Sequence, residues 1–123
     1  MTDFELRRFS THLRIGGQSI IEDVLGIAEG IETALPGSKL FGVPCWSAIC
    51  ASNLLKFNPP FGLRRLIIFG DNDASFVGQA TAYKLAHRLR RERPDLEIVV
   101  RIPDVAGQDW NDVLVFRGLA IAA

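Results

Sequence analysis

The sequence predicts an α/β fold in which a mostly parallel sheet of about four strands carries helices on both faces. Short apolar runs alternate with helix-forming segments along the chain, and the clearest run, Leu66–Phe69 (LIIF), is apolar at every position. Such a run is typical of a central parallel strand that is covered on both faces. Strands that alternate with helices form right-handed crossovers, and these produce a parallel sheet.

The first elements are marked by short apolar runs and by chain breakers. Residues 1–20 contain loosely alternating apolar positions, which predict a leader with a short edge strand or hairpin. Val24–Ala28 (VLGIA) is a short apolar run, as expected for a buried strand. Ile31–Leu35 is predicted to form one or two helical turns, which Pro36-Gly37 should stop.

A second strand and a short helix are predicted next. Leu40–Trp46 has the composition of a strand, and Pro44 confines it to an edge of the sheet or to the strand's end. Ser47 has the chemistry of a helix N-cap, so that Ala48–Lys56 is predicted as a helix.

The second half of the chain repeats the alternation. After Leu66–Phe69, the segment Gln79–Arg93 has apolar residues at helical spacing and predicts a long helix. Glu97–Ile102 is predicted as a fourth strand, and Gly107–Leu114 as a loop that turns into a helix.

Composition excludes several classes of protein. Fourteen Lys and Arg balance fourteen Asp and Glu among 123 residues, which argues against a polybasic coat protein but not against a local basic patch. No apolar window is long enough for a membrane span and no signal peptide is apparent, so we expect a cytoplasmic location and no membrane partner.

Acidic residues follow the ends of three predicted strands. Ligands of open parallel sheets bind beyond the carboxyl ends of the strands. Crowded carboxylates raise each other's pKa, and a divalent cation removes that conflict. Magnesium favours a few carboxylates, waters and phosphate oxygens. Any one of these acids could simply cap a helix, but together they predict a magnesium site. They are Glu29, Glu32, Asp71, Asp73, Asp109 and Asp112.

Three segments resemble motifs of the Toprim (topoisomerase–primase) domain. Leu25–Leu35 (LGIAEGIETAL) resembles its glutamate motif, and Leu66–Asp73 (LIIFGDND) resembles its Asp-x-Asp motif. Gly107–Leu114 (GQDWNDVL) is similar to the Gly-x-Asp-Trp-Asn-Asp segment of Toprim domains in phage and plasmid primase-helicases. The resemblance spans about residues 24–116, and it implies a single Toprim-like domain over residues 1–123.

The resemblance implies a role for each matching acid. Glu29 matches a glutamate that acts as general acid or base in nucleotidyl transfer or strand cleavage. Asp71 and Asp73 match the pair that binds Mg²⁺, for which Mn²⁺ is an alternative. Asp109 matches a further acid of the primase branch that assists metal or nucleotide binding.

Other residues near the motifs have less defined roles. Glu32 and Asp112 are candidate accessory acids. Bacterial primases carry an aspartate four residues after the glutamate, where this chain has Thr33. Family members usually have a glycine soon after Asp-x-Asp, and here Gly78 follows Asp73 by five residues.

The predicted long helix carries basic side chains. Lys84, Arg88 and Arg91 are candidates for phosphate contacts with nucleic acid. Cations near the end of a helix also complement its dipole, and a solvated helix end is the slightly favoured interpretation of these residues.

The resemblance implies a magnesium-dependent nucleotidyltransferase that acts on DNA and nucleotides during replication, as part of a phage- or plasmid-type DNA primase or primase-helicase. The sequence contains no Walker-type phosphate loop, so a helicase and a zinc-binding module are expected as partners. A Toprim-type DNA nuclease with the same acids is an alternative, and so is a non-catalytic module that binds nucleic acid or a partner. The presence of Glu29 speaks against the last.

Overall fold

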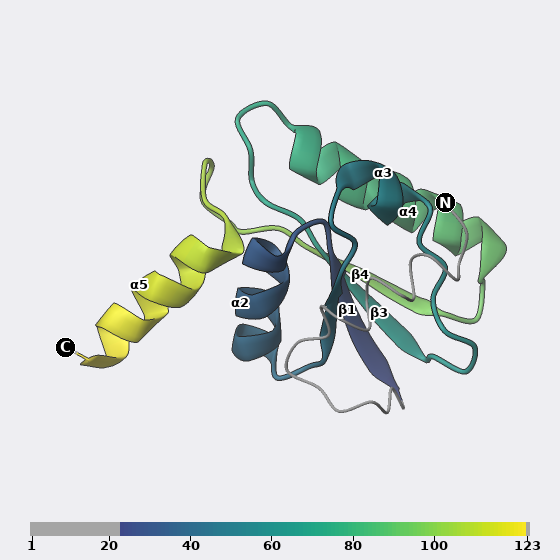
Figure 1. Ribbon diagram of the computed structural model, residues 1–123, viewed down its shortest axis with the longest axis horizontal. Helices are drawn as coiled ribbons and strands as arrows, with labels where there is room; N and C mark the ends of the chain where they lie inside the picture. Colours follow the sequence, from purple (N-terminus) through teal and green to yellow (C-terminus); the bar gives the residue numbers. More distant parts are fainter. Residues whose placement is uncertain (1–22, 123) are drawn as a thin grey trace.

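The computed structural model describes residues 23–122, which form one parallel sheet covered by helices (Figure 1). The strands are β1 (Val24–Ala28), β2 (Cys45–Ser47), β3 (Arg65–Phe69) and β4 (Glu97–Arg101). The helices are α2 (Ile31–Phe41), α3 (Ala51–Leu55), α4 (Val77–Glu92) and α5 (Trp110–Ala122). The predicted α/β class, parallel sheet and approximate number of strands are confirmed. The leader predicted at residues 1–20 lies outside the described residues.

Strand order determines where a ligand site forms. The order is β2-β1-β3-β4, and every neighbouring pair is parallel. After β1, the chain forms β2 along one edge of β1 and then returns to form β3 along the other edge. Ala28 at the end of β1 lies opposite Phe69 at the end of β3. The crevice at such a switch in strand order is the usual ligand site of open α/β sheets.

The two faces of the sheet pack against different pairs of helices. Ile27 and Ile68 point to one face, where Leu85 of α4 and residues of α3 cover them. Phe69 points to the opposite face, where it meets Trp110 of α5 and residues of α2. Successive side chains of a strand point to opposite faces, so each fully apolar strand serves both layers. The prediction of helices on both faces is confirmed.

Helix α2 is longer than the sequence predicts. The helix expected at Ile31–Leu35 continues to Phe41 with Pro36 inside it, so the predicted stop at Pro36 is wrong. Pro36 costs the helix one backbone hydrogen bond. Burial of Pro36 and its neighbours against the sheet offsets that cost. The helix ends instead at Gly42, whose φ of 67° is left-handed and whose N–H donates to the Ser38 carbonyl at 2.8 Å.

Two predicted boundaries near β2 are also wrong. The strand expected at Leu40–Trp46 begins only at Cys45, because α2 includes the first of those residues. The helix expected at Ala48–Lys56 begins at Ala51, and Ser47 does not cap it. The Ser47 hydroxyl instead accepts the N–H of Ile49 at 3.2 Å.

The later elements agree with the predictions apart from small shifts at their ends. The helix expected at Gln79–Arg93 is α4, which begins two residues earlier at Val77. The strand expected at Glu97–Ile102 is β4, and Gly107–Leu114 forms a loop that enters α5. Within residues 23–122, no helix has the length and apolar character needed to cross a membrane.

Candidate functional site

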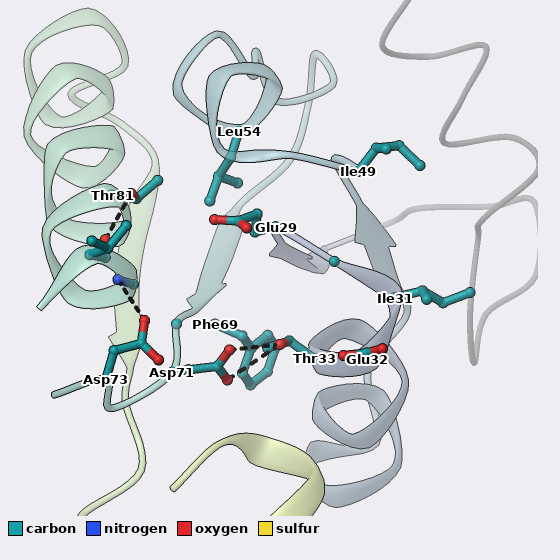
Figure 2. Close-up of a pocket in the computed structure, with 14 residues that line it drawn as sticks. Glu29, Ile31, Glu32, Thr33, Ile49, Leu54, Phe69, Asp71, Asp73 and Thr81 are labelled. Carbon is teal, nitrogen blue, oxygen red and sulfur yellow. Dashed lines mark hydrogen bonds between the residues drawn. The ribbon is translucent and has the colours of Figure 1, made fainter. Parts of the chain in front are cut away.

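A cleft of about 410 Å³ opens at the carboxyl ends of β1 and β3. Glu29, Asp71 and Asp73 line it, and Figure 2 shows them between the start of α4 on one side and α2 on the other. Glu29 directly follows β1, and the two aspartates lie two and four residues after the end of β3. The pairing of these two strands therefore brings together acids that lie more than forty residues apart in the sequence.

Asp71 is partly buried in the cleft. The Thr33 hydroxyl of α2 donates to both of its carboxylate oxygens, at 3.2 and 3.3 Å (Figure 2). Burial raises the pKa of Asp71, and the nearby charges of Asp109 and Asp73 add to the increase. The Thr33 hydroxyl and the backbone N–H of Trp110 lower that pKa and only partly oppose it. Asp71 is thus a carboxylate for which a bound cation would be favourable.

Asp73 is fixed by the start of α4. Its Oδ2 accepts the backbone N–H of Gly78 at 2.9 Å. A Cβ atom at Gly78 would lie 2.6 Å from that Oδ2 and 3.0 Å from the Asp71 carbonyl oxygen. Only glycine therefore allows α4 to approach the loop of residues 71–73, called the acidic loop below, this closely. The glycine that follows Asp-x-Asp at a longer spacing still contacts it directly.

Sequence reasoning did not identify Asn72 and Gln79, which hold the acidic loop in place. Gln79 Nε2 donates to Asn72 Oδ1 at 3.0 Å and to the Asp73 carbonyl at 3.1 Å. Asn72 Nδ2 donates to the Pro103 carbonyl at 2.8 Å, and the Asn72 N–H donates to the Gln108 carbonyl at 3.0 Å. The only signal in the sequence was the position of Asn72 between two aspartates. In extended backbone, successive side chains point in opposite directions, so Asn72 should point away from the cleft that its neighbours face.

Asp109 and Asp112 cap helix α5. The Asp112 N–H donates to Asp109 Oδ1 at 2.7 Å, and the Asp109 N–H donates to Asp112 Oδ2 at 3.1 Å. This reciprocal arrangement is a capping box, which satisfies backbone donors at the helix start. Neither side chain lines the cleft, although the charge of Asp109 reaches Asp71.

Two glutamates of the cleft are exposed. Glu29 is open to solvent, and its backbone carbonyl accepts the Ser47 hydroxyl at 3.3 Å, which holds the end of β1. Glu32 lines the cleft from the first turn of α2, where its charge also complements the helix dipole. Thr33, the next residue of α2, is buried.

The three basic candidates of α4 differ in their surroundings. The Arg88 guanidinium donates to the carbonyl oxygens of Leu55 and Phe57. It therefore fastens the segment after α3 onto α4. Lys84 and Arg91 are exposed and remain available to an external phosphate.

The donor set fits an open magnesium site. Within the part of the chain that the structure describes, no three His, Cys, Asp or Glu side chains form a ready group for a metal ion. Magnesium does not require such a cage, since waters and substrate phosphates complete its coordination. The hard oxygen donors of Asp71 and Asp73, together with the raised pKa of Asp71, suit this mode of binding.

Comparison with protein families matches residues 24–120 to a model described as a Toprim domain. The match includes β1 with Glu29, β3 with the two cleft aspartates, and most of α5. Searches among curated proteins and among solved structures find no match.

Proposed function

Since this chain belongs to the Toprim domain family, we propose that it catalyses magnesium-dependent nucleotidyl transfer on DNA, as part of a phage- or plasmid-type DNA primase or primase-helicase. Toprim domains provide magnesium-dependent phosphoryl transfer in enzymes that act on nucleic acids. The observation that supports catalysis here is the meeting of Glu29, Asp71 and Asp73 in one cleft at the switch in strand order. The proposed catalytic core is residues 24–116 of a single domain.

Each acid has a proposed task that follows from its surroundings. Glu29 is exposed and lines the cleft, and its proposed task is to accept the proton of an attacking hydroxyl. Asp71 and Asp73 would hold Mg²⁺ or Mn²⁺, with Asp109 assisting through its charge. The ion, when bound, would neutralise the phosphates and stabilise the leaving oxygen. Thr33 and Gly78 orient the two aspartates through the hydrogen bonds described above.

The remaining candidates supply accessory contacts in this proposal. Glu32 lies at the edge of the cleft and would bind a water of the metal shell, and Asp112 acts through its bond to Asp109. Lys84 and Arg91 would contact template phosphates. A zinc-binding module and a helicase of the same system would complete the primase.

The direct test measures two reactions of the purified chain, with Mg²⁺ and with Mn²⁺. One assay follows dinucleotide synthesis on a single-stranded template, and the other follows nicking of supercoiled plasmid. We expect dinucleotide synthesis that falls by about 10²-fold or more in Glu29→Gln and disappears in Asp71→Asn/Asp73→Asn. Asp95→Asn is the control, since Asp95 is an exposed acid far from the cleft, next to the amino end of β4.

The other outcomes separate the alternatives. Nicking that requires Glu29, without dinucleotide synthesis, would identify a Toprim nuclease and overturn the primase proposal. Neither reaction, with metal-dependent DNA binding retained, would identify a non-catalytic module.

A further inference from the structure

Large apolar side chains surround the mouth of the acidic cleft. Ile31, Ile49 and Val77 line the cleft, and each is about half exposed. Phe76 directly precedes Val77 and is 70% exposed. Scattered single apolar residues are normal on a protein surface, whereas a group around one cleft marks an interaction site. Figure 2 shows Ile31 and Ile49 on the side of the cleft opposite α4, the helix that Phe76 precedes.

Two of these residues have an unfavourable backbone conformation. Within residues 23–122, the non-glycine residues with positive φ are Ile49, at 79°, and Phe76, at 63°. Positive φ is rare for bulky and β-branched residues. Glycine would adopt it without strain. Folding therefore gains nothing from an exposed phenylalanine here, and such outliers concentrate where a ligand is held.

Phe76 is fixed relative to Asp73. Its N–H donates to the Asp73 carbonyl at 3.0 Å, and its carbonyl accepts the Ala80 N–H at 3.0 Å. One turn of the chain thus connects Asp73, whose carboxylate is proposed to bind metal, with Phe76. Phe76 is the N-cap residue of α4, and its aromatic ring is exposed.

This arrangement matches the alternation of charge and apolar surface along a nucleic acid strand. Each phosphate of a nucleic acid strand is joined to its base through one sugar, so a phosphate bound at Asp71 and Asp73 would bring a base close to the cleft. Aromatic side chains stack on bases of any sequence. Bases in a duplex already stack on each other, so only a single strand or an unpaired end offers a free base face.

We propose that Phe76 stacks on an unpaired base of single-stranded nucleic acid, with Val77 next to it in the chain and with Ile31 and Ile49 as the apolar surface across the cleft. The substrate class at this cleft is then single-stranded rather than duplex. The inference rests on the proposed function, since it places the adjoining phosphate at the acidic cleft.

The test uses anisotropy of labelled single-stranded oligonucleotides, in Ca²⁺ to limit chemistry, with three substitutions at Phe76. Phe76→Ala and Phe76→Gly should weaken binding about fivefold or more, the low end of base–aromatic stacking. Phe76→Trp should retain the affinity. Phe76→Gly should also raise the urea midpoint, because glycine accepts the positive φ. A gain in stability with a loss of binding excludes misfolding as the cause.

Two controls make the test specific. Phe61 is fully exposed and lies near Arg64 and Leu96, at the amino ends of the strands, so Phe61→Ala should leave binding unchanged. Oligonucleotides with abasic positions should bind the wild type less tightly and should no longer distinguish it from Phe76→Ala.

Several results would overturn the inference. They are an absence of oligonucleotide binding, equal losses on abasic and normal strands, equal losses on duplex, or no effect of the Phe76 substitutions. A failure of the proposed function would give a different result from a failure of this inference. The Asp71→Asn/Asp73→Asn variant would keep the metal dependence of oligonucleotide binding, and the Phe76 substitutions would still weaken binding to strands that carry bases.

Discussion

Gly78 is the residue on which the geometry of the acidic loop depends most. Gly78→Ala would place a Cβ atom 2.6 Å from Asp73 Oδ2 and 3.0 Å from the Asp71 carbonyl oxygen. The carboxylate or α4 must then move. We expect Mg²⁺ affinity to fall about 10- to 100-fold, as when a metal ligand loses its orienting partner. Calorimetric titration of Mg²⁺ measures this change.

The matched control for Gly78 is Gly30, which also lines the cleft but has no atom within 4 Å of an added Cβ. Its φ of −121° is allowed to any residue. Gly30→Ala should keep both metal affinity and stability, whereas Gly78→Ala should also lose about 1–3 kcal/mol of unfolding free energy in urea. Equal metal affinities of the two variants would contradict the role of Gly78.

Asp71 predicts an unusual dependence of stability on pH. Burial, first, and neighbouring carboxylates raise its pKa above the ordinary value of 3.8, so the folded chain holds this proton more tightly than the unfolded chain. The contribution of Asp71 to stability is therefore greatest in acid and is lost as pH rises through the raised pKa. Without metal, Asp71→Asn should be more stable than wild type at pH 7, because it removes a partly buried charge.

The advantage of Asp71→Asn should shrink as the pH falls and disappear below 3.8, where the wild-type carboxyl becomes protonated in both states. Urea midpoints of both proteins across this range measure the difference. A variant that is less stable than wild type at pH 7 would mean that the Thr33 hydroxyl outweighs burial at this site.

Among the elements, α4 combines a structural face with an exposed one. Arg88 donates to the carbonyl oxygens of Leu55, at the end of α3, and of Phe57. Arg88 also pairs with Glu92 at 3.2 Å, while Arg91 is exposed on the same helix. Arg88→Ala leaves backbone acceptors without their donor and should cost about 1.5–3 kcal/mol of stability. Arg91→Ala should change stability by less than about 0.5 kcal/mol.

Urea denaturation of the two variants distinguishes these roles, and binding of single-stranded DNA completes the comparison. We expect Arg91→Ala to weaken binding and to reduce its dependence on salt. If Arg88→Ala unfolds at the wild-type midpoint, its carbonyl contacts do not stabilise the fold.

Elements with a strong local signal could be predicted from the sequence, and elements decided by packing could not. The run of four apolar residues in β3 and the periodic helix α4 are both present where expected. The expected stop at Pro36 failed because its helix buries one side against the sheet, a tertiary effect that no local rule includes. The same helix then occupied the start of the predicted Leu40–Trp46 strand.

For the molecule as a whole, the acids that line the cleft could be named from the sequence, but which of them lie next to each other could not. Placing Glu29 beside Asp71 required the strand order, and alternating elements alone do not determine that order. Asp109 follows a strand end as expected, yet its carboxylate caps α5. Thr33 was noted only as a departure from the bacterial pattern, and its bond to Asp71 depends on how α2 packs over β3.

The distribution of charge over the whole chain leads to a final prediction about metal and stability. Six of the fourteen acids belong to the predicted site, which leaves eight acids against fourteen bases elsewhere. A divalent cation that binds only the folded cleft must stabilise the fold, by about 1.4 kcal/mol at ten times its dissociation constant.

Urea denaturation with Mg²⁺, compared with NaCl at equal ionic strength, measures this stabilisation of the whole molecule. The gain should disappear in Asp71→Asn/Asp73→Asn and persist in Asp95→Asn, whose acid lies beside the amino end of β4. The double variant should start from a higher stability without metal, since the crowded carboxylates that Mg²⁺ would neutralise are already gone. Mg²⁺ stabilisation of equal size in all three proteins would place the ion outside the cleft and would remove the basis for a metal-dependent reaction there.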